Sequence, residues 1–310
     1  MRDQLMITAI ASKVDKGLYF FNRRLEVLRT LLRVCELKSD PYSTVTNAVT
    51  LTEVRTFKIK EVKAYDSVTG RKLLQIYLSM ISEDSTCFIS KVDESGGGMY
   101  VVNIYKALTQ IATSHLESVV LERFGSKCLR IFRVLLLKKH VEQKQIEDFA
   151  MISAKEAKEL LYNMFSQKFI TTSEIAKTPD HAPSRTFYLF KVDIHKLAQH
   201  VLERSYKAMY NATLRKDNEL TEHRRLLDKQ ERVDAIIASI DQAGGDDTQK
   251  DEIEQTITPT ERDQIDTVKR TVQMLETSEI QIDDTMFVLE MYLFYANQDR
   301  LLKCTQKKKK

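Results

Sequence analysis

The chain has 310 residues, a formal net charge of +4 and 43% hydrophobic residues, enough for more than one buried core. It contains only 8 Gly and 4 Pro, far fewer than the roughly 12% that these two residues make up in an average protein. Because tight turns depend on them, the composition disfavours sandwiches, barrels and glycine-rich nucleotide folds. A mainly helical protein is predicted.

Residues 1–105 are predicted to form a first unit of helices and a β-hairpin. Apolar residues recur at spacings of three and four through residues 7–35, as on two helices or one bent helix. The sequence Thr50-Leu-Thr-Glu53 has the spacing of a capping box, which indicates that a short helix starts there. A third helical face follows at residues 74–81, and two β-rich segments around SGGG predict a hairpin within 86–104.

The same order of elements recurs in residues 123–193, after a predicted connecting helix over 106–122. Apolar spacing indicates a first helix near 128–136 and a short second helix over 145–151. A second capping-box pattern, Ser153-Ala-Lys-Glu156, precedes the third helix. The β-rich segments FITTSEI and TFYLFKV then predict a hairpin, or wing, with the loop KTPDHAPSR at its tip. This repeated order predicts tandem winged-helix domains.

The remaining residues, 194–310, are predicted to form a helical hairpin and a C-terminal helix. Apolar residues beyond Ile194 are mostly heptad-compatible, with dense charge between them. The helical run ends at AGGDD, and Thr258-Pro259-Thr-Glu261 restarts a helix with a hydroxyl cap and a proline in its first turn. We therefore expect an antiparallel coiled-coil hairpin. A last helix containing MFVLEMYLFY is apolar nearly all round, so it should pack on the hairpin or on a partner.

Catalytic and metal chemistry find little support in the sequence. His181 lies between Pro179 and Pro183 at the tip of the predicted wing and could act as a general base or ligand. No second candidate ligand lies near it, so a surface histidine in a stiffened loop is the better interpretation. The four cysteines are far apart and contain no C-x-x-C pair. We predict no catalytic residue, no metal site and no cofactor.

The candidate binding residues lie on the predicted third helix of each winged helix and beside the second wing. Lys155, Lys158 and Tyr162 have spacings of three and four, which places them on one outward face, opposite a predicted buried stripe that includes Phe165. Residues 123–195 carry 13 Lys and Arg against 8 Asp and Glu, so this region can attract a polyanion. An ordinary solvated lysine face is the alternative. The candidate DNA-binding residues are Lys155, Lys158, Tyr162, Lys168, Arg185, Arg71 and Lys72.

Five segments, in order along the chain, carry a resemblance to a known family. They are DESGGGMYVVNIYKAL, LESVVLERFGSKC, EQKQIEDFAM, SAKEAKELLY and TPDHAPSRTFYLF. With them the chain resembles the TFIIE-alpha-like winged-helix subunits of nuclear RNA polymerase III, the largest members of its initiation heterotrimer. The resemblance implies four extended winged helices followed by a coiled-coil hairpin. It also implies docking on the polymerase clamp and assistance in promoter opening at transfer RNA and 5S genes.

The chain departs from that family pattern in two places. Family members have two further winged helices before the first one predicted here, so we expect this chain to lack an N-terminal part. Residues 38–72 also match the pattern poorly, which weakens any DNA contact through Arg71 and Lys72.

The expected function is that of a non-catalytic subunit of DNA-directed RNA polymerase III in transcription initiation. The resemblance implies a nuclear protein whose partners are promoter DNA and other polymerase subunits, including the clamp of the largest subunit, with no membrane partner. A protein-docking scaffold whose winged helices never touch DNA is the alternative. Residues 228–282 carry a net charge of −8, which would repel DNA, so we expect the hairpin to contact protein.

Overall fold

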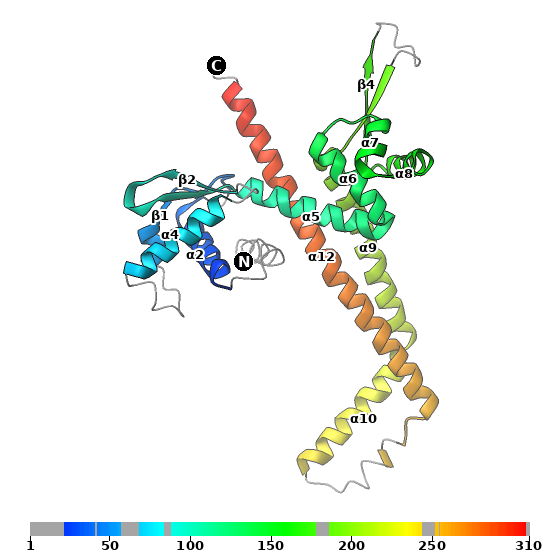
Figure 1. Ribbon diagram of the computed structural model, residues 1–310. Helices are drawn as coiled ribbons and strands as arrows, with labels where there is room; N and C mark the ends of the chain where they lie inside the picture. Colours follow the sequence, from blue (N-terminus) through cyan, green and yellow to red (C-terminus); the bar gives the residue numbers. More distant parts are fainter. Residues whose placement is uncertain are drawn as a thin grey trace. The chain divides into compact units, whose positions relative to one another are not determined.

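The structure is a computed structural model and is mainly helical, with two small antiparallel sheets among its described residues (Figure 1). This confirms the predicted fold class. The described residues are 22–40, 42–56, 68–83, 88–177, 186–243, 252–253 and 255–307. The chain divides into two compact units, one of residues 1–201 with 288–310 and the other of residues 202–287.

The first group of elements in unit 1 combines helices with a small sheet, as predicted. Its described helices are α2 (Asn22–Lys38), α3 (Leu51–Thr56) and α4 (Val68–Ser82), and its described strands are β1 (Val49–Thr50), β2 (Ile89–Asp93) and β3 (Met99–Val102). The strand order is β1-β3-β2, all antiparallel. Leu28, Leu74 and Leu78 are almost fully buried in the core of this group. The helix predicted near the N-terminus before α2 lies outside the described residues.

The strand β1 was not predicted, because two residues are too few to show an alternating pattern. Val49 pairs with Tyr100 of β3, and the chain then enters α3. The backbone N–H of Thr50 donates to Glu53 Oε2 at 3.1 Å, which supplies the carboxylate half of the predicted capping box. Glu53 also pairs with Lys38 at 2.6 Å. Because β1 pairs with β3, the predicted hairpin of β2 and β3 forms two strands of a three-stranded sheet.

Gly98, in the turn before β3, has a conformation that a larger residue would strain. Its φ is 119°, and an added Cβ would lie 3.0 Å from the ring of Tyr100. We expect Gly98→Ala to lower the free energy of unfolding of this sheet by about 1–3 kcal/mol, measured by hydrogen exchange of the β3 amides. Gly125→Ala is the control, because φ is 85° there and nothing lies within 4 Å of the added Cβ. Equal losses at both positions would contradict a contribution from the Tyr100 contact.

A long helix, α5 (Ile104–Phe124), follows β3 directly. The prediction that the strand includes Ile104 was wrong, because the helix begins there. Asn103 still forms an antiparallel bridge with Val45, and its side chain accepts a hydrogen bond from the Lys106 backbone N–H at 2.9 Å, which caps the helix. The last helix, α12 (Pro259–Lys307), begins in unit 2 and continues without interruption through the segment MFVLEMYLFY, so that its residues from Val288 onward belong to unit 1. That segment was predicted as a separate helix. Its Tyr292 ring stacks on Tyr105 of α5, with the ring centroids 6.3 Å apart.

The second group of elements in unit 1 repeats the order of the first. It contains α6 (Ser126–Lys138), α7 (Gln143–Ala150), α8 (Ala154–Ser166), β4 (Thr171–Ala176) and β5 (Thr186–Lys191). Figure 1 shows the three helices at the base of the β4–β5 hairpin. Val141, between α6 and α7, exchanges two backbone hydrogen bonds with Phe190 of β5, at 3.1 and 2.8 Å. This bridge occupies the position that β1 has in the first group.

Two details of α8 differ from the sequence-based expectation. Ser153 makes no side-chain capping bond, and Glu156 pairs instead with Lys127 of α6. The predicted capping box is therefore wrong, although the helix starts where expected. Ala157, Leu161 and Met164 are buried as predicted. Phe165 was predicted to be buried but is 44% exposed.

Unit 2 contains the second part of α9 (Ile194–Glu222), all of α10 (Arg224–Ala243) and the first part of α12. Lys216 of α9 donates to Glu279 of α12 at 2.6 Å. Glu219, near the end of α9, and His223, just after it, lie beside residues 263–271 of α12, so the two helices run antiparallel. The helix predicted as continuous is interrupted at His223. Leu226, Leu227, Val233, Ile237, Ile253, Ile257 and Ile265 form a common apolar cluster.

The start of α12 carries the third capping box that the sequence predicts, and here both contacts are present. The Thr258 backbone N–H donates to Glu261 Oε2 at 2.9 Å, and the Glu261 N–H donates weakly to Thr258 Oγ1 at 3.4 Å. Lys229 of α10 donates to the same carboxylate at 2.9 Å. The lysine, followed by the Thr258 contacts, lowers the pKa of Glu261 from 4.5 to about 2.

The depressed pKa of Glu261 predicts an acid-sensitive contribution to the stability of unit 2. Because the folded pKa lies below the unfolded value, the contribution is fully present above pH 4.5 and disappears as the pH falls through about 2. We expect Glu261→Gln to lower the thermal midpoint above that window and to match the wild type below it, measured by circular dichroism at a series of pH values. Asp283→Asn, an exposed acid on the same helix, is the control. A constant difference at all pH values would contradict the assignment.

Candidate nucleic-acid interface

The outward face of α8 is formed as the apolar spacing predicts. Ala157, Leu161 and Met164 pack inward, which leaves Lys155, Lys158 and Tyr162 on the opposite, exposed side. Tyr162 is 73% exposed. All three residues line the same groove, so the structure brings these predicted site residues together.

That groove runs between α8 and one face of the β4–β5 hairpin and has a volume of about 590 Å³. We call it the α8–wing groove. Its lining residues are Gln143, Lys155, Lys158, Glu159, Leu161, Tyr162, Phe165, Thr172, Tyr188 and Phe190. The strand register explains why these three residues of the hairpin line the groove together. Thr172 pairs with Phe190, and Tyr188 lies two residues from Phe190, so all three side chains are on the same face of the sheet.

The α8–wing groove is more apolar than the sequence suggested. Aromatic side chains make up much of its walls, and Phe165 and Tyr188 are 44% and 43% exposed. Charge is confined to Lys155, Lys158 and Glu159 on α8. The aromatic residues on β5 could have been found from alternation along TFYLFKV, which places Tyr188 and Phe190 on one face. The sequence does not reveal that this face turns toward α8.

The remaining candidates around the second wing do not join the groove. Lys168 is exposed just after α8, where φ is 62°, and its backbone N–H donates to the Phe165 carbonyl at 2.9 Å. It therefore lies at the helix exit, as predicted, but it does not line the groove. Arg185 and the loop that carries His181 lie outside the described residues.

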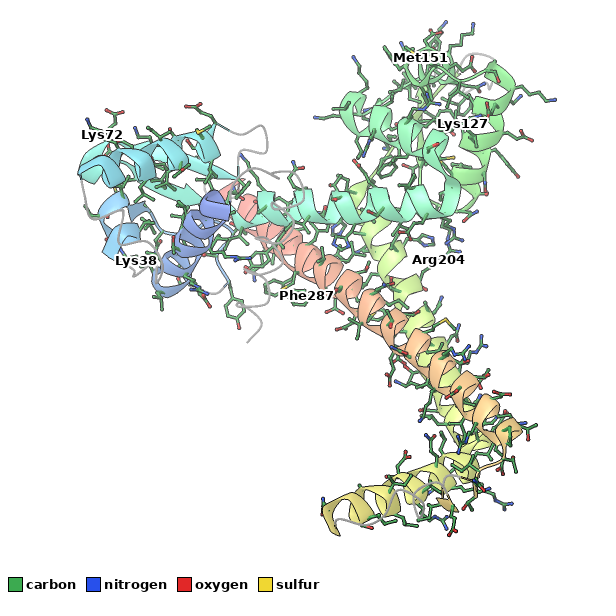
Figure 2. All side chains as sticks on the ribbon, turned by 60° about the horizontal axis from the view of Figure 1, so that its bottom comes forward. Lys38, Lys72, Lys127, Met151, Arg204 and Phe287 are labelled. Atoms are coloured by element: carbon green, nitrogen blue, oxygen red, sulfur yellow. The ribbon has the colours of Figure 1, made fainter. Side chains whose placement is uncertain are left out.

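The candidates in the first group are less well supported. Lys72 is exposed on α4 (Figure 2), whereas the side chain of Arg71 lies outside the described residues. Ile76 and Met80 follow Lys72 at spacings of four and are 51% and 44% exposed. The outward face of α4 that starts at Lys72 is therefore largely apolar, which is a poor match to a phosphate backbone.

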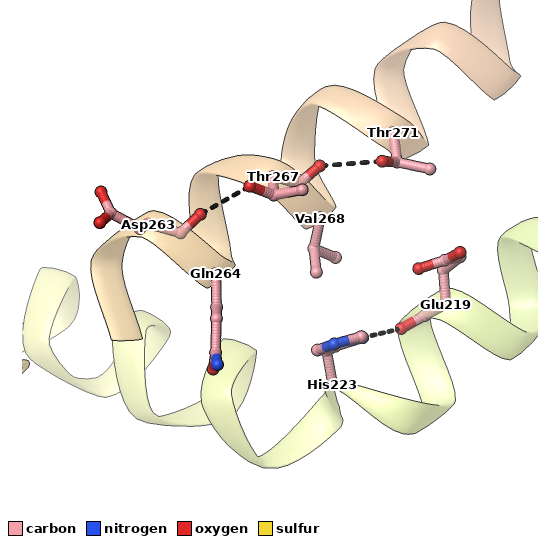
Figure 3. Close-up of a pocket in the computed structure, with 7 residues that line it drawn as sticks. All are labelled: Glu219, His223, Asp263, Gln264, Thr267, Val268 and Thr271. Atoms are coloured by element: carbon pink, nitrogen blue, oxygen red, sulfur yellow. Dashed lines mark hydrogen bonds between the residues drawn. The ribbon is translucent and has the colours of Figure 1, made fainter. Parts of the chain in front are cut away.

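A second, smaller cavity of about 280 Å³ lies in unit 2, and its lining residues do not form a recognisable catalytic or ligand-binding group (Figure 3). Figure 3 shows Gln264 and Val268 projecting from α12 toward the segment around His223, where α9 ends and α10 begins, whereas Asp263 points away. His223 Nδ1 lies 3.1 Å from the Glu219 carbonyl oxygen.

Across the described residues, no three His, Cys, Asp or Glu side chains are grouped to hold a metal ion. Within the same residues, no helix is long and apolar enough to cross a membrane.

Comparison with known proteins finds consistent similarity to one subunit of RNA polymerase III. The family model for the POLR3C C-terminal winged-helix domain matches residues 116–192, and that for the helical hairpin domain of DNA-directed RNA polymerase III subunit RPC3 matches 225–288. The chain is 47% identical over 292 residues to the RPC3 subunit of Homo sapiens, which covers 94% of this chain and 53% of that protein. The chain is thus similar to RPC3 subunits along almost its whole length and contains a POLR3C winged-helix domain and an RPC3 helical hairpin domain. An RPC3 subunit of Danio rerio is 42% identical over 292 residues, covering 94% and 52%.

More distant RPC3 proteins match a shorter part. The subunit of Dictyostelium discoideum is 35% identical over 184 residues, 58% of this chain and 28% of that protein. The chain spans about half the length of the vertebrate RPC3 relatives it matches. The winged-helix match extends from the middle of α5 through β5, and thus includes α8 and the α8–wing groove.

Proposed function

We propose that this chain acts as a non-catalytic subunit of RNA polymerase III in transcription initiation, in the nucleus. Its winged helices contact promoter DNA and the clamp of the largest subunit, and its other partners belong to the initiation heterotrimer. The observation that supports this proposal is the 47% identity to an RPC3 subunit over 94% of the chain.

The DNA contact is proposed at the start of α8. Lys155 and Lys158 are exposed in the first two turns of the helix, where backbone N–H groups also favour a phosphate. Lys168, exposed at the helix exit, adds positive charge, and we propose that Arg185, from the sequence of the predicted wing, adds more. Point charges of this kind hold a backbone but do not distinguish bases. We therefore propose a phosphate contact with little sequence preference, and a weaker one through Arg71 and Lys72.

The helices of unit 2 are proposed to contact protein rather than DNA. Residues 228–282 carry 14 Asp and Glu against 6 Lys and Arg. Because two polyanions repel each other, this acidic segment disfavours DNA and suits a basic protein surface. Tyr210 and Met274, which are 68% and 65% exposed in this unit, add apolar contact area.

A protein-docking scaffold with no DNA contact is the second candidate function. Two observations favour it: the apolar lining of the α8–wing groove, and the exposed Ile76 and Met80 on α4. Both surfaces resemble the apolar patches that bind other proteins.

Site-specific crosslinking from α8 within assembled RNA polymerase III on promoter DNA tests these two functions. A photoreactive residue is placed at position 155 or 158, and the same residue at Lys106, exposed on α5, serves as the control. We expect crosslinks to DNA from positions 155 and 158 and fewer from 106. Crosslinks from 155 and 158 to protein alone would favour the scaffold.

A further inference from the structure

We propose that the α8–wing groove is a docking site for an acidic, amphipathic segment of another protein. The segment inserts apolar side chains between α8 and β5 and places Asp or Glu side chains against Lys155 and Lys158. This site does not depend on the DNA contact proposed above, although the two share both lysines and therefore exclude each other.

The apolar part of the groove is a continuous surface built from two elements. Leu161 forms part of the α8 wall beside Phe165 and Tyr162, and Tyr188 and Phe190 supply the opposite wall from β5. Leu161 is buried at the floor of this surface, whereas the rings of Tyr162, Phe165 and Tyr188 are exposed. These exposed rings lose their unfavourable contact with water only when a partner covers them. A groove between a helix and a sheet accepts the apolar face of a peptide, as in helix-in-groove recognition.

Duplex DNA is a poor occupant of the groove itself. Its phosphates require positive or hydrogen-bonding partners, which the aromatic walls do not supply. Glu159 lies among the lining residues and would repel a phosphate that entered. DNA can contact the two lysines at the start of α8, but the apolar groove beside them offers no further favourable interaction with its phosphates.

Charge complementarity selects the class of peptide. Neither Lys155 nor Lys158 forms an ion pair with any residue that the structure describes, whereas the neighbouring Glu156 is already paired with Lys127. Residues 123–195, the part of the sequence that contains the groove, carry a net charge of +5. A partner with acidic residues beside its apolar anchors therefore gains both attraction on approach and specific pairing, whereas a basic one is repelled.

The test is a selection of random displayed peptides on the purified full chain, with counter-selection on a Tyr188→Ala chain. We expect enriched peptides to combine Leu, Ile or Phe with Asp or Glu. Synthetic versions should bind at least about tenfold more weakly to Tyr188→Ala. Phe187→Ala is the matched control, because Phe187 is a 42% exposed ring on the opposite face of the same strand. It should leave peptide affinity unchanged.

Three results would overturn the inference. They are enrichment of Lys- and Arg-rich peptides, equal losses of peptide affinity in Tyr188→Ala and Phe187→Ala, and self-association of the chain that Tyr188→Ala abolishes, which would make a second copy the occupant.

A measurement of duplex DNA binding separates this inference from the proposed function. Tyr188→Ala should leave duplex binding unchanged, and acidic peptide should displace duplex DNA. Duplex binding without any selective peptide would leave the DNA contact standing and remove the docking site.

Discussion

Replacing Phe132 by Ala is expected to lower the free energy of unfolding of the second winged helix by about 3–5 kcal/mol. The ring is completely buried on α6, the helix that packs against α5, α7, α8 and β5. Removing it leaves a cavity that these elements cannot all close at once, because interiors are tightly packed. Hydrogen exchange of the α6 and α8 amides reports the stability of this part separately from the rest of the chain.

The matched control for this prediction lies on the same helix. Leu137 is 81% exposed near the end of α6, so Leu137→Ala should change the free energy of unfolding by no more than about 0.5 kcal/mol. Protection of α8 that falls equally in both variants would show that α6 is not the centre of this core.

The helical elements could be predicted because their signals are local. Cys128, Ile131, Phe132 and Leu135 recur at helical spacing and are buried, and Thr258 with Glu261 forms the capping box that its sequence indicates. Two of the failures involve contacts between distant residues. Glu156 pairs with Lys127 of another helix in place of Ser153, and the Val141 bridge depends on Phe190, nearly fifty residues away. Local pattern contains no information about such partners.

Only part of the candidate site could be predicted from the sequence, because only part of it lies within one local segment. Spacing along α8 places Lys155, Lys158 and Tyr162 on one face, and the structure agrees. The aromatic wall opposite them comes from β5, and its position depends on how the hairpin packs on α8. Phe165 was assigned to the core because it is apolar, yet the groove leaves it 44% exposed. A polyanion site was therefore expected where the structure shows lysines beside an apolar groove.

Replacing Lys155 and Lys158 together by Glu is expected to weaken duplex DNA binding about equally on promoter and random sequences. Both residues are exposed at the start of α8 and offer point charges without a bidentate base contact. Each phosphate that a lysine neutralises contributes about −0.9 to the slope of log affinity against log salt. Losing two such contacts should therefore make the slope less steep by about 1.8. Fluorescence anisotropy over a salt series measures both the affinity and the slope.

A charge-matched variant separates this contact from the general effect of removing positive charge. Lys106→Glu with Lys196→Glu changes the net charge by the same amount at exposed positions on α5 and α9. We expect a smaller loss of affinity in this variant and an unchanged slope, because long-range attraction is screened within about 10 Å at 0.1 M salt. If the α8 variant keeps both the affinity and the slope of the wild type, α8 does not lie at the DNA. The lysines then serve the protein-docking role, since the groove beside them remains apolar and open to a partner.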